Sequence, residues 1–148
     1  MIDVQIYRYH PEQERQPWMQ SLSLPEEFRA RMVLDALEFL HEADPALVYR
    51  RSCREGVCGS DGMNINGKNR LACITPVSEV LGTSNELIIR PLPGMPVIRD
   101  LVVDQSLFFK QYESITPWLI NHDPAPAIER LQSPEERARL DGVYECIL

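Results

Sequence analysis

Apolar and polar residues alternate at the beginning of the chain, where polar side chains separate Ile2, Val4 and Ile6. A period of two residues is typical of a strand that buries one face. The alternation returns in residues 18–24, after a polar stretch that contains Pro11. The pattern therefore predicts two antiparallel strands, joined by a rather long connection, at the start of the chain.

The period then changes from that of a strand to that of a helix. Apolar residues recur at helical spacing in residues 32–43, and Asp44-Pro45 ends the pattern. The polar face of this predicted helix carries three carboxylates that we expect to be solvated: Asp35, Glu38 and Glu42. Together with a short apolar strand at residues 87–90, these elements predict an α+β fold.

Helical spacing appears again in the last third of the chain. An apolar stripe runs from Leu107 to Leu119, interrupted at Pro117, and Asp104 is placed to cap it. A capping box that begins at Ser133, with Pro at the first helical position, predicts the start of a second helix. Gly142 is placed to end that helix. These signals predict an α-helical segment.

The boundary between the two parts is predicted from prolines. Three of them, with a glycine, lie in residues 91–96 and indicate a turn-rich stretch. We therefore place the first domain at residues 1–99 and the helical segment at residues 100–148.

Composition and charge narrow the range of functions that the chain could have. The 148 residues are 44% apolar and 25% charged, as in an ordinary globular protein, and the net charge of −7 argues against a nucleic-acid partner. No apolar run approaches the roughly 20 residues that a membrane helix needs. The N-terminus lacks a basic-then-apolar signal. We expect a cytoplasmic bacterial chain without a membrane span of its own.

Candidate chemistry gathers in one short segment. Four residues separate Cys53 from Cys58, two separate Cys58 from Asp61, and eleven separate Asp61 from Cys73. A plant-type [2Fe–2S] cluster is held by the spacing C-x4-C-x2-C and a distant fourth Cys. The segment matches with Asp61 in the third position, and ferric iron accepts a carboxylate. We expect these four residues to ligate a [2Fe–2S] cluster, or else Ser60 or water to replace Asp61.

The residues between these ligands fit a loop that wraps a cluster. Gly56, Gly59 and Gly62 tolerate the backbone angles that such a loop demands, and they leave N–H groups free to donate to sulfur. Five basic residues flank the segment and are expected either to offset the cluster charge and dock an acidic patch, or to form a solvated rim: Arg50, Arg51, Arg54, Lys68 and Arg70.

Two simpler interpretations remain as alternatives. A zinc-stabilised interaction module without a redox role would use four Cys or His ligands, although no second C-x2-C-like knuckle follows here. A disulfide between Cys53 and Cys58 would leave Cys73 unpaired. A Rieske cluster is excluded, because none of the three histidines neighbours a cysteine: His10, His41 and His122.

The segments around the ligands resemble the iron–sulfur subunit of succinate dehydrogenase, respiratory complex II. Arg51-Ser-Cys-Arg-Glu-Gly-Val-Cys-Gly-Ser-Asp61 and Leu71-Ala-Cys-Ile-Thr-Pro76 carry the resemblance, and residues 90–104 and 140–147 resemble the same subunit. Related fumarate reductase subunits usually have Cys at the third ligand position. Asp61 there resembles a subset of bacterial succinate dehydrogenases.

The resemblance implies a β-grasp [2Fe–2S] ferredoxin-like domain in residues 1–99 and the beginning of an α-helical ferredoxin domain in residues 100–148. It implies an electron-transfer subunit of succinate dehydrogenase, in the tricarboxylic acid cycle and aerobic respiration. Single electrons would pass from the FAD of a flavoprotein subunit through the [2Fe–2S] cluster towards further clusters and quinone. No residue of this chain is expected to act on succinate. A fumarate reductase subunit and a stand-alone ferredoxin are the alternatives.

The resemblance also implies what lies beyond the last residue. In the family, the cysteine that matches Cys146 opens the ligand set of a [4Fe–4S] cluster. We expect Cys146 to be such a ligand in the full-length subunit, or else a lone thiol in this fragment. We expect a truncated chain whose missing half would hold the [4Fe–4S] and [3Fe–4S] clusters. That half would bind the membrane-anchor subunits and keep the protein peripheral on the cytoplasmic face of the bacterial inner membrane.

Overall fold

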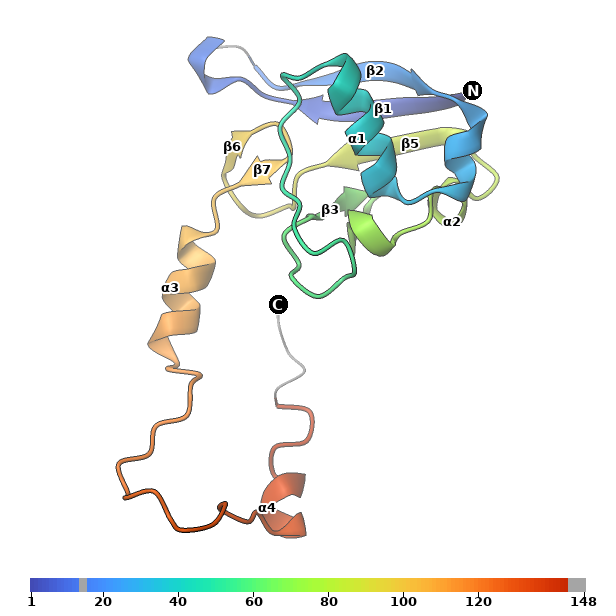
Figure 1. Ribbon diagram of the computed structural model, residues 1–148. Helices are drawn as coiled ribbons and strands as arrows, with labels where there is room; N and C mark the ends of the chain where they lie inside the picture. The colour runs from blue at the N-terminus through green and yellow to red at the C-terminus, as the bar shows by residue number, and fades with distance from the viewer. Residues whose placement is uncertain (14–15, 144–148) are drawn as a thin grey trace. The chain divides into compact units, whose positions relative to one another are not determined.

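The computed structural model describes residues 1–13 and 16–143 and divides the chain into two compact units, Met1–Ser114 and Ile115–Leu148 (Figure 1). The first unit is an α+β fold with a mixed five-stranded sheet, consistent with a 2Fe–2S ferredoxin-like domain. The sheet is built from β1 (Ile2–Arg8), β2 (Trp18–Leu24), β3 (Gly62–Ile65), β4 (Lys68–Leu71) and β5 (Glu86–Arg90). A two-stranded ribbon is formed by β6 (Val97–Arg99) and β7 (Val102–Val103).

The helices are few and short. They are α1 (Val33–Ala43), α2 (Val77–Leu81), α3 (Ser106–Ser114) and α4 (Pro134–Ala138). Single 3-10 turns lie at Pro11–Gln13, Glu26–Ala30 and Ala72–Ile74. Within the part of the chain that the structure describes, no helix is long and apolar enough to cross a membrane.

The strand order in the large sheet is β2-β1-β5-β3-β4. Strands β1 and β2 pair antiparallel from Ile2 opposite Leu24 to Arg8 opposite Trp18, which confirms the two strands predicted from the alternating pattern. Strand β5 lies parallel to β1, and β3 lies antiparallel to both β5 and β4. The strand predicted at residues 87–90 therefore forms the middle of the sheet.

The core lies between one face of the sheet and α1, which crosses that face in Figure 1. Ile2, Val4 and Ile6 are fully buried on it, whereas Asp3 points to the exposed face. The inward stripe of α1 is buried at Val33, Leu34, Ala36, Leu37 and Leu40. Each fully buried aliphatic side chain contributes about 1.5–3 kcal/mol relative to exposure, so this pairing of strand and helix periods holds the fold together.

The β3–β4 hairpin was not predicted from the sequence. Its turn is Asn66-Gly67, with φ values of +46° and +83°, which matches the positive angles that a two-residue hairpin turn requires. The Asn66 side chain donates to the carbonyl oxygens of Val80 and Glu86, at 2.8 and 3.1 Å, and accepts from Ile88 N at 2.6 Å. The hairpin is thereby fastened to the edge of β5.

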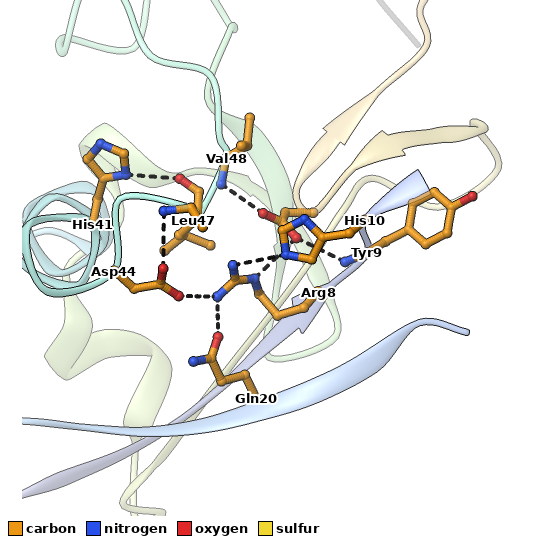
Figure 2. A network of polar contacts seen from close by, with 10 residues as sticks. Arg8, Tyr9, His10, Gln20, His41, Asp44, Leu47 and Val48 are labelled. Atoms are coloured by element: carbon orange, nitrogen blue, oxygen red, sulfur yellow. Dashed lines mark hydrogen bonds and ion pairs between the residues drawn. The ribbon is translucent and has the colours of Figure 1, made fainter. Parts of the chain in front are cut away.

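A buried polar network fastens the chain just before the cysteine segment (Figure 2). Arg8, only 3% exposed, donates through Nε to Asp100 Oδ1 at 3.1 Å and through Nη1 to Asp44 Oδ2 at 2.6 Å. Asp100 is fully buried and also accepts from Val48 N at 2.9 Å and Tyr9 N at 2.9 Å. The network joins the end of β1, the end of α1 and the β6–β7 turn.

The helical predictions for the last third are only partly confirmed. Helix α3 ends at Ser114, before Leu119, because Pro117 lacks an N–H group and disfavours helical geometry in the residue before it. The capping box at Ser133 is confirmed: Ser133 Oγ accepts from Glu136 N at 3.1 Å, and Ser133 N donates to Glu136 Oε2 at 2.9 Å. Helix α4 ends at Ala138, earlier than the stop predicted at Gly142.

The first compact unit extends past Arg99, the predicted end of the cluster domain. Asp100, Leu101 and Val103 are buried, and the β6–β7 ribbon is tied to residues 48–50 by backbone and side-chain hydrogen bonds. The division at residue 99 itself stays a prediction. Cys146 lies outside the described residues.

Candidate metal centre

The four predicted ligands come from two pieces of chain. Cys53 and Cys58 lie in the loop between α1 and β3, which we call the cysteine loop (residues 50–61). Asp61 immediately precedes β3, and Cys73 lies in the 3-10 turn that follows β4. Since β3 and β4 pair as a hairpin with Gly62 opposite Leu71, the two ends of this hairpin bring Asp61 and Cys73 side by side.

Backbone hydrogen bonds hold Asp61 and Cys73 together. Cys73 N donates to Asp61 Oδ2 at 2.5 Å, and Ala72 N donates to Asp61 O at 3.2 Å. Both side chains are buried, with Asp61 only 2% exposed and Cys73 only 7% exposed. The hairpin therefore supplies a rigid and dry half of the site.

The cysteine loop supplies the other half. Cys58 N donates to Cys53 Sγ at 3.3 Å, and Glu55 N donates to the same sulfur at 3.5 Å. The loop turns through left-handed backbone angles at Arg54, Gly56 and Gly59, with φ between +67° and +76°. Cys53 is half-buried and Cys58 is exposed, so this half of the site faces solvent.

Gly56 is the place where the two halves meet. A Cβ added there would lie 3.0 Å from Ile74 Cδ1, in the same 3-10 turn that carries Cys73. Glycine at this position therefore meets two demands at once, a φ of +76° and a close approach to the neighbouring segment. The cysteine loop packs closely against the end of the hairpin because Gly56 has no side chain to separate the two segments.

The thiols differ in acidity. The pKa of Cys58 is lowered to about 6, first by the hydrogen bond with Ser60 Oγ, 3.1 Å away, and then by nearby backbone donors. The pKa of Cys73 is raised, first by burial and then by the contact with Asp61 and the charges of Asp61 and Cys53. All three described cysteines are free, so the alternative disulfide between Cys53 and Cys58 is not formed.

Asp61 provides the test of whether these residues fit a metal cluster. Its Oδ1 atom is buried and has no hydrogen-bond partner among the described residues, while Oδ2 is held by Cys73 N. A buried carboxylate oxygen without a donor costs free energy, because it has lost water and gained nothing in return. Coordination to iron would satisfy this atom, and three thiolates with one carboxylate are donors that ferric iron accepts. The residues fit a [2Fe–2S] cluster.

A structural zinc site makes a different demand on its ligands. Across residues 1–13 and 16–143, no three Cys, His, Asp or Glu side chains converge closely enough to hold a single metal ion. A structural zinc site would place four ligands on one atom, whereas a two-iron cluster takes two on each iron. The ligand spacing, in which no second C-x2-C-like knuckle follows, favours the cluster over zinc.

Four of the five basic residues that flank the ligands make side-chain contacts of their own. Arg54 Nη2 pairs with Glu38 Oε2 at 2.9 Å and Asp35 Oδ1 at 3.3 Å, and Arg51 forms an ion pair with Glu38 Oε1 at 3.0 Å without hydrogen-bond geometry. The expectation that Asp35 and Glu38 are merely solvated is therefore wrong, because the loop arginines lie against them. Arg50 donates to Val103 O and Arg70 pairs with Glu79.

The residues that sequence reasoning overlooked are the ones that hold the loop in place. Asp35 and Glu38 are separated from Arg54 by 19 and 16 positions, so no short-range pattern links them. Ser60, which the sequence suggested only as a substitute ligand, also contacts Cys58 Sγ. The hairpin that pairs Asp61 with Cys73 had one available sign in the sequence, the Asn66-Gly67 dipeptide.

Comparison with known proteins gives a consistent result. Residues 3–110 match the family described as "2Fe-2S iron-sulfur cluster binding domain". The chain is 54% identical over 144 residues to a succinate dehydrogenase iron-sulfur subunit of Coxiella burnetii, covering 97% of this chain and 60% of that protein. It is 46% identical over 144 residues to the subunit of the same name from Paracoccus denitrificans, covering 97% and 54%.

A solved structure is similar over nearly the same length. A chain of the Mycobacterium smegmatis Sdh1 complex in the apo form superposes with a TM-score of 0.76 at 28% identity, covering 99% of this chain and 59% of that one. The chain thus spans about half the length of the curated relatives it matches.

Proposed function

Because the chain belongs to the family of 2Fe-2S iron-sulfur cluster binding domains and is a homologue of succinate dehydrogenase iron–sulfur subunits, we propose that it relays single electrons in a succinate dehydrogenase. Electrons would come from the FAD of a flavoprotein subunit that oxidises succinate, and would leave towards further clusters and quinone. Asp61, where fumarate reductase subunits usually carry Cys, favours this direction of the reaction.

The ligands in this proposal are Cys53, Cys58, Asp61 and Cys73. One observation carries it: Asp61 Oδ1 is buried beside Cys73, at the third position of the ligand spacing, and has no hydrogen-bond partner within residues 1–13 and 16–143. Since Oδ2 accepts from Cys73 N, Asp61 has one oxygen free to bind iron. When bound, the cluster supplies the gain and loss of one electron at a time.

In this proposal, the residues of the chain hold and orient the ligands and exclude water from one side of the site. Asp61 and Cys73 are buried by the hairpin, which excludes water from one side. The N–H groups of Glu55 and Cys58 donate to Cys53 Sγ, and backbone donors of this kind help to set the potential of an iron–sulfur cluster. Cys58 stands exposed at the other side, where a partner protein would approach.

The remaining parts of the proposal concern the division into domains and the partner subunits. Residues 1–99 would be the β-grasp domain, which the sheet order β2-β1-β5-β3-β4 supports. Residues 100–148 would begin the α-helical ferredoxin domain, with Cys146 as the first ligand of a [4Fe–4S] cluster. That domain would bind membrane-anchor subunits, at the cytoplasmic face of the bacterial inner membrane.

The experiment that tests the cluster is electron paramagnetic resonance (EPR) of the anaerobically purified chain before and after dithionite, with iron, sulfide and zinc assays. We expect a rhombic S = 1/2 signal on reduction, with two irons and two sulfides per chain, as a [2Fe–2S] cluster requires. Stoichiometric zinc with no signal in either state would overturn the relay.

Asp61→Cys then tests the fourth ligand. Exchanging a hard oxygen donor for a thiolate changes one iron's coordination, so we expect the EPR spectrum and the midpoint potential to change while iron content stays the same. An unchanged spectrum and potential would show that Asp61 is not a ligand. Asp3→Cys, on the exposed face of β1, is the control for adding a cysteine elsewhere.

A further inference from the structure

The backbone of Arg54 has a conformation that its residue type disfavours. Its φ is +67°, in the left-handed region, directly after Cys53 in the cysteine loop. Glycine adopts such angles readily, and Gly56 and Gly59 do so in the same loop. A residue with a Cβ adopts them at a cost, and keeps them when surrounding contacts over-determine the conformation.

The contacts that hold Arg54 come from α1. Its Nη2 lies 2.9 Å from Glu38 Oε2 and 3.3 Å from Asp35 Oδ1, both on the helix that packs on the sheet. Arg51 pairs with the other oxygen of Glu38. Two guanidinium groups and two carboxylates sum to a formal charge of zero, so this group as a whole places little net charge near the ligands.

The peptide group that follows Arg54 is the one that reaches the sulfur. Glu55 N donates to Cys53 Sγ at 3.5 Å, and the torsion angles of Arg54 decide where this N–H points. If Arg54 moved to an ordinary right-handed or extended conformation, the Glu55 N–H would turn away from Cys53. Arg54 therefore links two features: its side chain pairs with α1, and its backbone sets the direction of the Glu55 N–H group at Cys53 Sγ.

We propose that Arg54 is a positioning residue: its ion pairs with α1 hold the left-handed turn that aims Glu55 N–H at Cys53 Sγ and so raise the reduction potential of the [2Fe–2S] cluster. The inference rests on the proposed function only in that Cys53 ligates the cluster. Hydrogen bonds to ligand sulfurs favour the reduced, more negative state, and the potential rises accordingly.

A purely electrostatic role for these residues makes the opposite prediction. Removing a carboxylate near a negative cluster makes reduction easier, so loss of Glu38 through charge alone would raise the midpoint potential. Loss of Glu38 as the anchor of Arg54 would release the turn and lower the potential. The sign of the change in midpoint potential in Glu38→Ala therefore distinguishes an electrostatic role of Glu38 from its role as the anchor of Arg54.

The test is an EPR-monitored redox titration of the full chain, reconstituted with iron and sulfide, comparing Glu38→Ala with Glu42→Ala. Both variants remove one carboxylate from α1, but Glu42 is exposed and Arg54 contacts Glu38. We expect a lower midpoint potential for Glu38→Ala and an unchanged or slightly raised one for Glu42→Ala. A potential for Glu38→Ala that is unchanged or raised overturns the proposal.

A second pair of variants tests the backbone conformation itself. Arg54→Ala removes the anchor and keeps the Cβ, so we expect the midpoint potential to fall, whereas Arg54→Gly adopts the left-handed turn without an anchor and should stay nearer the parent. In the Arg54→Gly background, Glu38→Ala should produce no further fall. Equal falls for Arg54→Gly and Arg54→Ala would mean that side-chain charge, not conformation, is responsible.

Failure of this inference is distinguishable from failure of the proposed function. A parent chain that forms no [2Fe–2S] cluster overturns both. The role of Arg54 alone is overturned if the parent chain has the expected spectrum and iron content but Glu38→Ala does not lower the midpoint potential, or Arg54→Gly falls as far as Arg54→Ala.

Discussion

Two groups of ion pairs hold the cysteine loop, and they lie in opposite environments. At its base, Arg8 and Asp100 are 3% and 0% exposed and pair with each other, and Asp100 accepts from Val48 N in the chain that enters the loop (Figure 2). At its turn, the side chains of Arg54, Asp35 and Glu38 are 47%, 32% and 25% exposed. Both groups join segments far apart in the sequence, yet the two groups should differ in what they control.

The difference follows from solvation. A buried ion pair cannot be broken cheaply, because the charge left behind has neither water nor a partner. An exposed pair exchanges its partner for water, so it contributes little to stability. The base of the loop should therefore set whether the domain is folded, whereas the turn should set the local conformation beside the ligands without much effect on folding.

The largest effect is expected for Asp100→Ala, at the base. It leaves Arg8 buried with one partner fewer and removes the acceptor of Val48 N and Tyr9 N, so we expect a loss of about 3–5 kcal/mol in the free energy of unfolding. Urea unfolding followed by circular dichroism measures it. Asp3→Ala on the exposed face should stay within about 0.5 kcal/mol of the parent. Equal losses in the free energy of unfolding for Asp100→Ala and Asp3→Ala would contradict the role of Asp100 in holding the fold.

A smaller effect is expected where the loop closes, at Gly56→Ala. The left-handed φ costs about 1–2 kcal/mol for an alanine, and the new Cβ would also push against Ile74, 3.0 Å away. Gly59→Ala has a similar φ, and no atom of the described residues lies within 4 Å of the new Cβ, so this variant isolates the backbone cost. Iron bound per chain should fall further in Gly56→Ala. Equal iron content in Gly56→Ala and Gly59→Ala would contradict a role in iron binding for the close packing of Gly56 against Ile74.

The next effect depends on pH. The hydrogen bond from Arg8 holds the pKa of Asp44 below its ordinary value, so its contribution is present above the unfolded pKa of about 4 and is lost as pH falls through the lowered folded pKa. Asp44→Asn should therefore cost on the order of 1 kcal/mol at pH 7, and the difference from the parent should shrink towards pH 2. Urea midpoints at several pH values measure this, and a difference that is constant with pH would contradict it.

The smallest effect on folding is expected at the turn. Glu38→Ala should change the free energy of unfolding by about 1 kcal/mol or less, and raising the salt concentration should reduce that difference, because the pair is exposed and screened. The comparison between the two groups would fail if Glu38→Ala destabilised the domain as strongly as Asp100→Ala. Unfolding in low and high salt decides between these outcomes.

Local patterns determined a good part of this protein. The alternation of Ile2, Val4 and Ile6 sufficed for the first strand, because a strand that buries one face shows its period directly. The spacing of Cys53, Cys58 and Asp61 sufficed for the candidate ligands, because one loop must deliver donors at fixed separations to a small cluster. The capping box at Ser133 was likewise a local signal that formed.

Only the tertiary structure decided how the site is held. The contact of Asp61 with Cys73 depends on a hairpin between them, and the contacts of Arg54 with Glu38 and of Arg8 with Asp100 cross 16 and 92 positions. Pairings at such separations depend on how helices and strands pack, and burial sets their energy. The sequence by itself thus determined which residues are candidate ligands of the metal cluster. Packing decided which oxygen of Asp61 lacks a hydrogen-bond partner among the described residues, and which side chains hold the loop.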